Sequence, residues 1–228
     1  MTSATPAPPV LSYDPDNKSN ADLIRDAARL RYVDVDQPVL DCTYGRGVFW
    51  RHVHPKDFTG VDIDPDLIVD AETHGRPDAS FIVADFTDLP FDGGTFQTVV
   101  LDPPYKLNGT SSGKGPAASD RLYGVDTTTW AGLSWQEKHE LIRAGITEGT
   151  RVLAAGGHLL VKCQDQVCSG QVRWQTRDFA AHAETLGHRL VDRLDISSYR
   201  AQPAGRRQVH ARRTMSTLLV LRLERPDR

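Results

Sequence analysis

Four short apolar runs in the first half of the chain each end at an aspartate. The runs before Asp41, Asp62, Asp85 and Asp102 recur at intervals of about 20 residues, with helical or turn-forming segments between them. This alternation is typical of an α/β protein with a doubly wound parallel sheet. Ligands of such sheets gather outside the carboxyl ends of the strands. The four aspartates are therefore expected to converge on one edge and to form a site.

The length and composition suit a globular α/β protein. The 228 residues suffice for one sizeable domain, and 39% hydrophobic with 25% charged residues is ordinary. No apolar run approaches the roughly 20 residues that a membrane helix needs, and residues 1–9 lack the pattern of a signal peptide. We expect a cytoplasmic protein with a mobile tail over residues 1–16 and a single domain over residues 17–228.

The three cysteines, Cys42, Cys163 and Cys168, do not suggest a disulfide framework, because their number is low and odd. The last two have four residues between them and no second pair exists, so the spacing does not fit a zinc site. We expect buried free thiols and no metal.

The first strand, residues 38–41, leads into a Gly45-x-Gly47 turn and an apolar segment expected to be helical. The glycines permit a tight turn and close approach of the backbone to a ligand, and a helix N-terminus would offer free N–H groups. A third glycine is missing, which argues against the dinucleotide-binding fingerprint. Asp62, near the end of a strand over residues 58–64, is placed to accept ribose hydroxyls. Asp64, before Pro65, is expected to cap the next helix.

The third strand, residues 79–84, is followed by Asp85 and Phe86. Asp85 is suited to accept the exocyclic amine of an adenine ring, and Phe86 to stack near it. A helix cap and a core phenylalanine explain the same two residues equally well, so both interpretations stay open.

The fourth strand, residues 96–101, ends in Asp102-Pro103-Pro104-Tyr105. Proline has no N–H and a fixed φ, so the carbonyl groups of this segment are free to accept hydrogen bonds from a ligand. A carboxylate, rigid carbonyls and an aromatic ring together suit a planar group that bears an NH₂.

These motifs resemble, in order, those of the S-adenosylmethionine-dependent DNA amino methyltransferases, which act on adenine or cytosine. The resemblance covers roughly residues 38–105; Asp-Pro-Pro-Tyr is its specific part, and the cofactor half is shared by many class I methyltransferases. It implies the Rossmann-like sandwich of that class, with a seven-stranded, mostly parallel sheet and an antiparallel last strand. The family often has Asp-Pro-Phe-x-Gly-x-Gly-Thr as its first motif, whereas Cys42, Thr43 and Val48 occupy the variable places here.

The resemblance also implies roles for individual residues. S-adenosylmethionine is the expected cofactor, with its ribose on Asp62, its adenine on Asp85 and its methionine end at the glycine turn and Asp41. The expected catalytic residues are Asp102, Pro103, Pro104 and Tyr105. The expected cofactor-binding residues are Asp41, Thr43, Tyr44, Gly45, Gly47, Asp62, Ile63, Asp85 and Phe86.

Other segments complete the predicted fold. A helix is expected to start at Ser19 or Asn20, another spans residues 134–153 with a Ser134/Glu137 capping box, and Gly156-Gly157 is expected to end it. A further helix covers residues 174–186. Strands over 158–163, 189–196 and 215–223 bring the total to seven, the last two as a hairpin. The glycine-rich residues 106–124 are expected to form a lid.

A basic loop is expected at residues 197–213. Between Arg189 and Arg213 the chain has seven arginines against two aspartates, although its overall net charge is −3. The planar fork of arginine favours phosphate, so this loop is interpreted as a nucleic-acid contact, with a merely solvated face as the alternative. The expected nucleic-acid-binding residues are Lys106, Arg173, Arg206, Arg207, Arg212 and Arg213.

The sequence therefore predicts methyl transfer to an exocyclic amine of DNA, with adenine N6 as the main target. Cytosine N4 or an RNA base is an alternative within the same chemistry, and a non-catalytic accessory subunit on the same fold is an alternative from another class. A methyltransferase for a protein or a small molecule would leave the basic loop unexplained. No segment is long enough for a separate recognition domain, so the lid and the basic loop, a partner protein or a second copy would supply any specificity.

Overall fold

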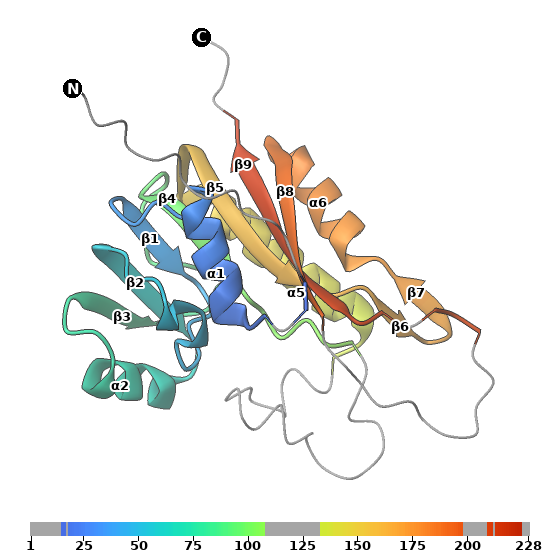
Figure 1. Ribbon diagram of the computed structural model, residues 1–228, viewed down its shortest axis with the longest axis horizontal. Coiled ribbons are helices and arrows are strands. Elements are labelled where there is room, and N and C mark those ends of the chain that lie inside the picture. Colours follow the sequence, from blue (N-terminus) through green and yellow to red (C-terminus); the bar gives the residue numbers. More distant parts are fainter. Residues whose placement is uncertain (1–14, 17, 108–132, 198–208, 212, 225–228) are drawn as a thin grey trace, which may run out of the picture.

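A twisted seven-stranded sheet runs through the computed structural model of the protein (Figure 1). The structure describes residues 15–16, 18–107, 133–197, 209–211 and 213–224. The strands are β1 (Pro38–Asp41), β2 (Asp57–Asp62), β3 (Ala79–Val83), β4 (Phe96–Leu101), β5 (Leu153–Cys163), β6 (Gln166–Cys168), β7 (Gln171–Arg173), β8 (His188–Ser197) and β9 (Met215–Leu223). The helices are α1 (Asn20–Arg29), the 3₁₀ turn η1 (Val48–Arg51), α2 (Pro65–His74), α5 (Trp135–Val152) and α6 (Gln175–Thr185).

The order of the strands in the sheet is β3-β2-β1-β4-β5-β9-β8. Strands β1 to β5 pair in parallel, and β9 is antiparallel to both β5 and β8. The predicted α/β class, the seven strands and the antiparallel last strand are thus confirmed. Since β1 has β2 on one side and β4 on the other, the order of the sheet reverses at β1. In open α/β sheets ligands bind at such a switch point.

Helices cover the two faces of the sheet (Figure 1). On one face, Ile142 and Ile146 of α5 and Phe179 of α6 pack against buried residues of the central strands. On the other face, Leu23 of α1 and Trp50 of η1 form a second buried cluster with the same strands. Burial on both faces explains why the central strands are continuous apolar runs rather than alternating ones.

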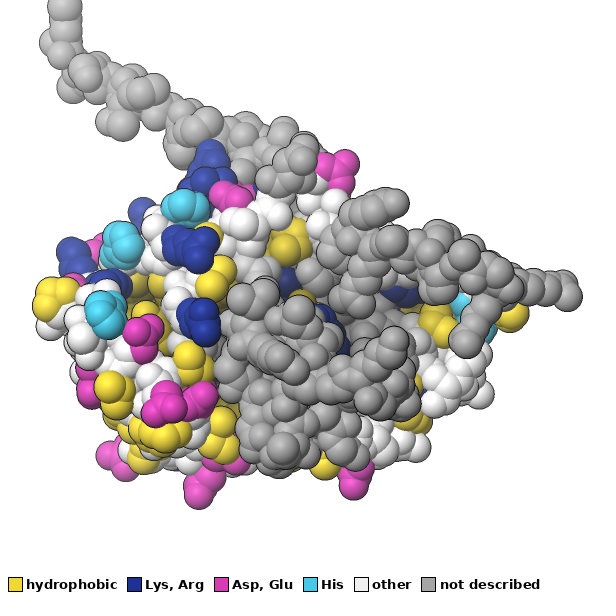
Figure 2. All heavy atoms as spheres, turned by 90° about the horizontal axis from the view of Figure 1, so that it is seen from below, with side chains coloured by type: hydrophobic (Ala, Val, Ile, Leu, Met, Phe, Trp, Pro, Cys, Tyr) yellow, Lys and Arg dark blue, Asp and Glu magenta, His cyan; other side chains and the backbone are white. Residues whose placement is uncertain are grey.

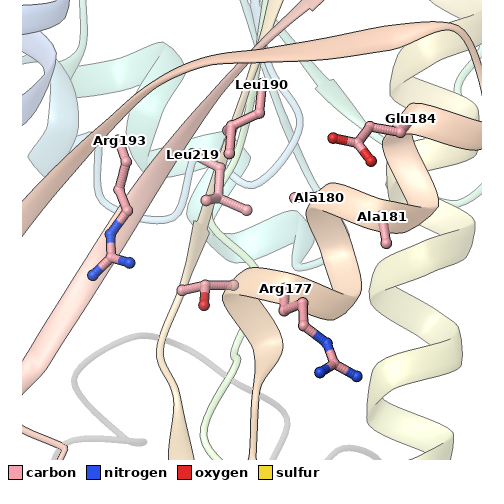
Figure 3. Close-up of a pocket in the computed structure, with 8 residues that line it drawn as sticks. Arg177, Ala180, Ala181, Glu184, Leu190, Arg193 and Leu219 are labelled. Carbon is pink, nitrogen blue, oxygen red and sulfur yellow. The ribbon is translucent and has the colours of Figure 1, made fainter.

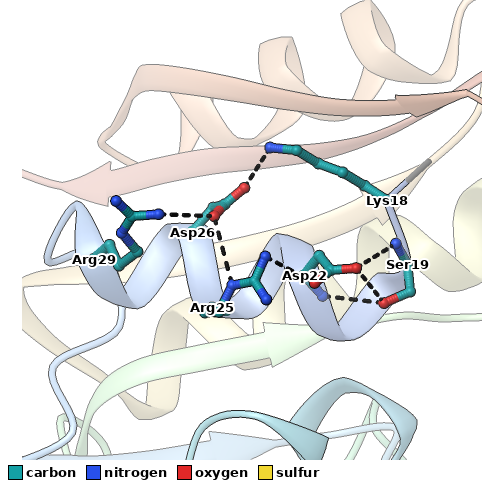
Figure 4. A network of polar contacts seen from close by, with 6 residues as sticks. All are labelled: Lys18, Ser19, Asp22, Arg25, Asp26 and Arg29. Atoms are coloured by element: carbon teal, nitrogen blue, oxygen red, sulfur yellow. Dashed lines mark hydrogen bonds and ion pairs between the residues drawn. The ribbon is translucent and has the colours of Figure 1, made fainter. Parts of the chain in front are cut away.

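The start of α1 follows from its first residues (Figure 4). Ser19 is the N-cap, and its hydroxyl and backbone exchange hydrogen bonds with Asp22 in a capping box. Asp26, which is buried, pairs with Lys18 at 2.5 Å. The predicted Ser134/Glu137 box at the start of α5 and the Asp64 cap of α2 are confirmed as well.

Two local predictions were wrong, and one element was missed. The segment after the glycine turn forms only the four-residue turn η1. Strand β5 begins at Leu153, directly after α5, so Gly156 and Gly157 lie inside the strand rather than at the end of the helix. A Cβ at Gly157 would lie 2.7 Å from the Gln97 carbonyl oxygen, close to an irregularity in the pairing of β4 with β5. The hairpin of β6 and β7 was not anticipated.

Several predicted segments lie outside the described residues. These are residues 1–14 of the tail, residues 108–124 of the lid, and residues 198–208 and 212 of the basic loop. Among the described helices, none is both long and apolar enough to cross a membrane.

Candidate active site

Three of the four strand-end aspartates lie on one face of the sheet, at its carboxyl edge. Val39 and Val100 belong to the buried cluster on the α1 side, so Asp41 and Asp102, two residues further along β1 and β4, point to the same side. Asp62 ends β2, the next strand, and its charge and that of Asp102 both raise the pKa of Asp41. The structure therefore brings these carboxylates together at the switch point.

Asp41 organises the turn that follows β1. The side chain is 2% exposed; Oδ2 accepts a hydrogen bond from Trp50 Nε1 at 2.6 Å, and Oδ1 accepts one from the Thr43 backbone at 2.9 Å. Burial raises the pKa of Asp41 to about 7, and neighbouring carboxylates add to the rise. Both oxygens have protein partners, so the contribution of Asp41 is to shape the turn.

The glycine turn is tied to the end of β2. Asp62 Oδ2 accepts a hydrogen bond from the Gly45 backbone at 2.8 Å, and Tyr44 N–H donates to the Val61 carbonyl at 2.8 Å. Gly45 and Gly47 have φ of +56° and +63°, which a side chain would strain. The Tyr44 ring lies over Gly47, where a Cβ would come within 2.4 Å of its hydroxyl oxygen.

Thr43 joins this turn to the Asp-Pro-Pro-Tyr segment. Its hydroxyl accepts a hydrogen bond of 2.7 Å from the backbone N–H of Asp102 and lies 3.4 Å from Asp41 Oδ1. One side chain therefore connects the two halves of the site, which are 59 residues apart in the chain.

The Asp102 carboxyl group is partly buried directly beyond β4. Burial raises its pKa to about 6, and the positive charge of Lys162 opposes the rise. Above this pH the group is a carboxylate, which can only accept hydrogen bonds. Pro103 is buried, and Pro104 and Tyr105 are half-buried, so the segment is partly exposed.

Two buried glutamines hold the backbone that follows Asp102. Gln166 Nε2 and Gln175 Nε2 both donate to the Tyr105 carbonyl oxygen at 2.8 Å, and Gln166 Oε1 accepts from Leu107 N–H at 3.2 Å. These bonds hold the chain on both sides of Lys106. Gln164 N–H in turn donates to Gln175 Oε1 at 3.0 Å, so the start of α6 also supports the segment.

Asp85 and Phe86 follow β3, which is an edge strand of the sheet. Asp85 Oδ1 accepts hydrogen bonds from Thr87 N–H at 2.9 Å and from the Thr87 hydroxyl at 2.8 Å. The Phe86 ring lies against α5, where a Cβ at Gly145 would come within 2.5 Å of it. Both residues thus have structural partners, and the expected contact with adenine stays a prediction.

Two arginines near the Tyr105 segment stack on tryptophans. The guanidinium carbon of Arg173 lies 3.8 Å from the centre of the Trp135 ring, and that of Arg213 lies 4.4 Å from the centre of the Trp174 ring. Trp174 is 40% exposed. Arg206, Arg207 and Arg212 lie outside the described residues. Figure 2 shows acidic, basic and histidine side chains interspersed over the described part of the underside.

Sequence reasoning missed the residues that support the site. These residues lie in other elements than the residues that they contact: Trp50 in η1, Lys162 in β5, Gln166 in β6 and Gln175 in α6. A lysine in the apolar run of residues 158–163 was the one signal of this kind that the sequence offered. The cysteines are buried and free, as expected, and within the described residues no group of histidine, cysteine and acidic side chains is arranged to hold a metal ion.

A hollow beside α6 lies away from this edge. Its volume is about 310 Å³, and α6, β8 and β9 line it through residues that include Arg177, Leu190 and Leu219 (Figure 3). None of the expected site residues lines it.

The carboxyl edge fits the expected cofactor. A Cβ at Gly45 would meet nothing closer than the Thr43 carbonyl oxygen at 3.9 Å, so the backbone here borders open space. Ile63, beside Asp62, is 65% exposed and offers an apolar surface to an adenine ring. Each Asp62 oxygen accepts one backbone N–H and retains capacity for a second donor.

Residues 39–107 match the model of a family described as a methyltransferase domain. A SAM-dependent methyltransferase from Methanosarcina mazei has a similar structure, with 14% identity, a TM-score of 0.53, and coverage of 86% of this chain and 97% of that one. The chain has the class I methyltransferase fold. The matched segment implies S-adenosylmethionine as the cofactor.

Other solved structures share this fold at similar distance. A complex between the Trm112 methyltransferase activator of Haloferax volcanii and a methyltransferase contains a chain with 16% identity and a TM-score of 0.55, over 91% of this chain and 96% of that one. The [4+2]-cyclase SpnF has 16% identity and a TM-score of 0.53, over 82% of this chain and 68% of its own. No curated protein sequence matches the chain. Since one of these proteins is a cyclase, the fold does not define the reaction.

Replacing Thr43 tests the link between the two halves of the site. In Thr43→Val a methyl group faces the Asp102 N–H, which loses its acceptor, so the free energy of unfolding should fall by about 1–3 kcal/mol. Thr43→Ser keeps the oxygen and should retain most of the stability. Urea unfolding of the two variants and the wild type measures this difference, and equal stability of the two variants would contradict the role given to the hydroxyl.

Proposed function

We propose that this protein transfers a methyl group from S-adenosylmethionine to the exocyclic amine of a base in DNA, with adenine N6 as the target. The observation that carries the proposal is the position of Asp102. Its carboxyl group stands at the switch point of a methyltransferase fold, directly before two prolines and an aromatic ring, and its backbone is bonded to the turn expected to hold the cofactor.

The target amine is a poor nucleophile because its lone pair is delocalised into the base. The Asp102 carboxylate and the Pro103 carbonyl are proposed to accept its two hydrogens and to favour a tetrahedral nitrogen. Orientation of this kind can contribute several kcal/mol to catalysis. S-adenosylmethionine, when bound, supplies an activated methyl group on its sulfonium. Tyr105 offers a face on which a base can stack, an interaction typically worth about 1–3 kcal/mol, which helps to offset the cost of taking the base out of a duplex.

The cofactor is proposed to lie along the carboxyl edge from β4 toward β3. The methionine end would lie at the turn of Gly45 and Gly47, which Asp41, Thr43 and Tyr44 shape. The ribose would bond to Asp62. The adenine would lie beside Ile63, with Asp85 and Phe86 at the far end; their partners Thr87 and α5 make their contribution the least direct of the set.

The stacked arginines support a nucleic acid as the substrate. Stacking on Trp135 and Trp174 holds the guanidinium groups of Arg173 and Arg213 in place, and the planar fork of arginine suits a phosphate group. Arg173 pairs with Gln166 in the β6–β7 hairpin, and Gln164 Nε2 donates to the Arg213 carbonyl oxygen at 3.4 Å. Both arginines are thus tied to the residues that support Tyr105. Lys106, Arg206, Arg207 and Arg212 are proposed to extend this phosphate-binding surface.

Cytosine N4 and an RNA base remain alternatives within this chemistry, because Asp-Pro-Pro-Tyr recognises an amine rather than a particular ring. A non-catalytic accessory subunit is the alternative from another class, and the intact segment from Asp102 to Tyr105 argues against it. Specificity would come from the lid, the basic loop or a partner. A partner protein is a reasonable proposal, since one methyltransferase of this fold is described in a complex with an activator.

Asp102→Ala tests the catalytic assignment. We expect methyl transfer to fall by about 100-fold or more, because the amine loses its acceptor, while calorimetry shows that S-adenosylmethionine still binds. Asp70→Ala on the exposed face of α2 is the matched control and should keep full activity. Retained activity of Asp102→Ala on nucleic acid would contradict the assignment.

Arg173→Gln and Arg213→Gln test the nucleic-acid surface. Each variant should bind DNA more weakly, and each should reduce the slope of log K against log salt concentration by about 1, because one phosphate contact is lost. Arg189→Gln, whose arginine pairs with Glu224 on another part of the surface, is the control. Fluorescence anisotropy at several salt concentrations gives the slopes. Slopes equal to that of the wild type would leave these arginines as a solvated surface only.

A further inference from the structure

Lys162, near the end of the central strand β5, has no exposed surface. Its Nζ donates to Asn20 Oδ1 at 3.0 Å and to the Ser216 hydroxyl at 2.9 Å. Both acceptors are neutral. Asn20 is also the first residue of α1 (Figure 4 shows this end of the helix), and a helix N-terminus disfavours a nearby cation. A buried ammonium in such surroundings is costly unless an opposite charge lies close by.

The geometry of the sheet supplies that charge from Asp102. Leu101 of β4 pairs with Val161 of β5 in parallel register, so the next residues, Asp102 and Lys162, are neighbours across the two strands. Val100 and Leu160 both lie in the buried cluster on the α1 side. Two residues further along, Asp102 and Lys162 therefore face the same side.

The aromatic ring of the catalytic segment is close to the same amine. Lys162 Nζ lies 5.7 Å from the centre of the Tyr105 ring, within the range of a cation–π interaction. One buried ammonium thus lies near both groups that are proposed to receive the base.

Three other sets of titratable groups lie near Lys162 or Asp102, on β8, on β5, and on β1 with β2. Asp195 of β8 also acts on Lys162, but it accepts hydrogen bonds from Arg193 and from the Thr217 hydroxyl. Cys163 is a buried thiol that faces the opposite cluster. On the side of Asp102, the carboxyl groups of Asp41 and Asp62 are further sources of negative charge.

We propose that Lys162 is a positioning residue whose buried ammonium keeps Asp102 ionised and holds the Tyr105 ring where the target base stacks. The purpose of this coupling rests on the proposed function, but the coupling itself rests on the arrangement of the two strands. An ionised Asp102 accepts the hydrogens of an amine, whereas a protonated one would spend one oxygen as a donor.

The pH dependence follows from the sign of the interaction. The pKa of Asp102 is raised by burial to about 6 while Lys162 opposes the rise. The acceptor is therefore lost as the pH falls through about 6. Without the charge of Lys162 the pKa should rise by a further one to two units or so, which is the usual effect of an opposite charge at this range. The loss should then occur near neutral pH.

The direct test follows the Asp102 carboxyl carbon by NMR in protein labelled with ¹³C-carboxyl aspartate. The resonance is assigned by its absence in Asp102→Asn. The pKa of Asp102 should rise by about one to two units in Lys162→Met and in Lys162→Gln. Methionine keeps the length of the side chain without its charge, and glutamine keeps a hydrogen-bond donor for Ser216. Thr98→Val, a buried substitution in β4 away from the carboxyl edge, should not move this pKa.

Two outcomes would overturn the inference. One is a titration of Asp102 in Lys162→Met that coincides with that of the wild type; the other is a shift of the same size in Thr98→Val. Thermal unfolding and cofactor binding identify a variant that fails to fold, in which case Lys162→Gln provides the measurement. Where the wild type methylates a nucleic acid, the acidic limb of its pH–rate profile should move with the titration. A wild type that methylates no nucleic acid would contradict the proposed function and leave the NMR test of Lys162 intact.

Discussion

The hydrogen bond from the Asp102 backbone to the Thr43 hydroxyl is the contact on which the candidate site depends. It crosses the switch point of the sheet, between the parallel strands β1 and β4, and joins a glycine turn to the Asp-Pro-Pro-Tyr segment. The pairing of the strands brings the two segments to the same edge, and this bond sets how they face each other. The hydrogen bond between Asp102 N–H and the Thr43 hydroxyl would therefore help to set the position of a cofactor at the turn relative to a base at Tyr105.

Electrostatics imposes the second constraint. Several carboxyl groups lie along one edge, and burial raises the pKa of Asp41 to about 7 and that of Asp102 to about 6. The charges of Asp102 and Asp62 add to the rise at Asp41. Asp41 accepts hydrogen bonds from Trp50 and Thr43, which stabilise its charged form. Asp102 lacks such donors among the described residues and depends on the charge of Lys162. The difference leaves Asp102 free to accept hydrogen bonds from a ligand, while Asp41 serves the turn.

Much of the fold and part of the site could be predicted from the sequence. Strand β4 and strand β9 were placed to the residue because a buried apolar run, bounded by turn or charged residues, is a local signal. The Ser134/Glu137 box fixed the start of α5 in the same way. The prediction that Gly156 and Gly157 end the helix was wrong because glycine fits a helix end and an irregular strand equally well. Which of the two forms depends on the pairing with the neighbouring strand β4.

The supporting residues could not be predicted for a different reason. Gln166 and Gln175 contact the Tyr105 carbonyl from 61 and 70 residues away, and the bond of Lys162 to Asn20 spans 142. No local pattern marks such contacts, because they arise only after the sheet has formed. The same holds for the Phe86 ring, whose packing on Gly145 of α5 was one of two interpretations that the sequence left equal.

The most direct test of the account is to identify the product. The purified protein would be incubated with S-adenosylmethionine carrying a labelled methyl group and with matched DNA and RNA, and the nucleic acids then digested to nucleosides for mass spectrometry. The account predicts label on an exocyclic amine, as N6-methyladenine in DNA, and none with Asp102→Ala. Label on a ring carbon or a ring nitrogen, or its complete absence from every nucleic acid while the cofactor binds, would contradict it.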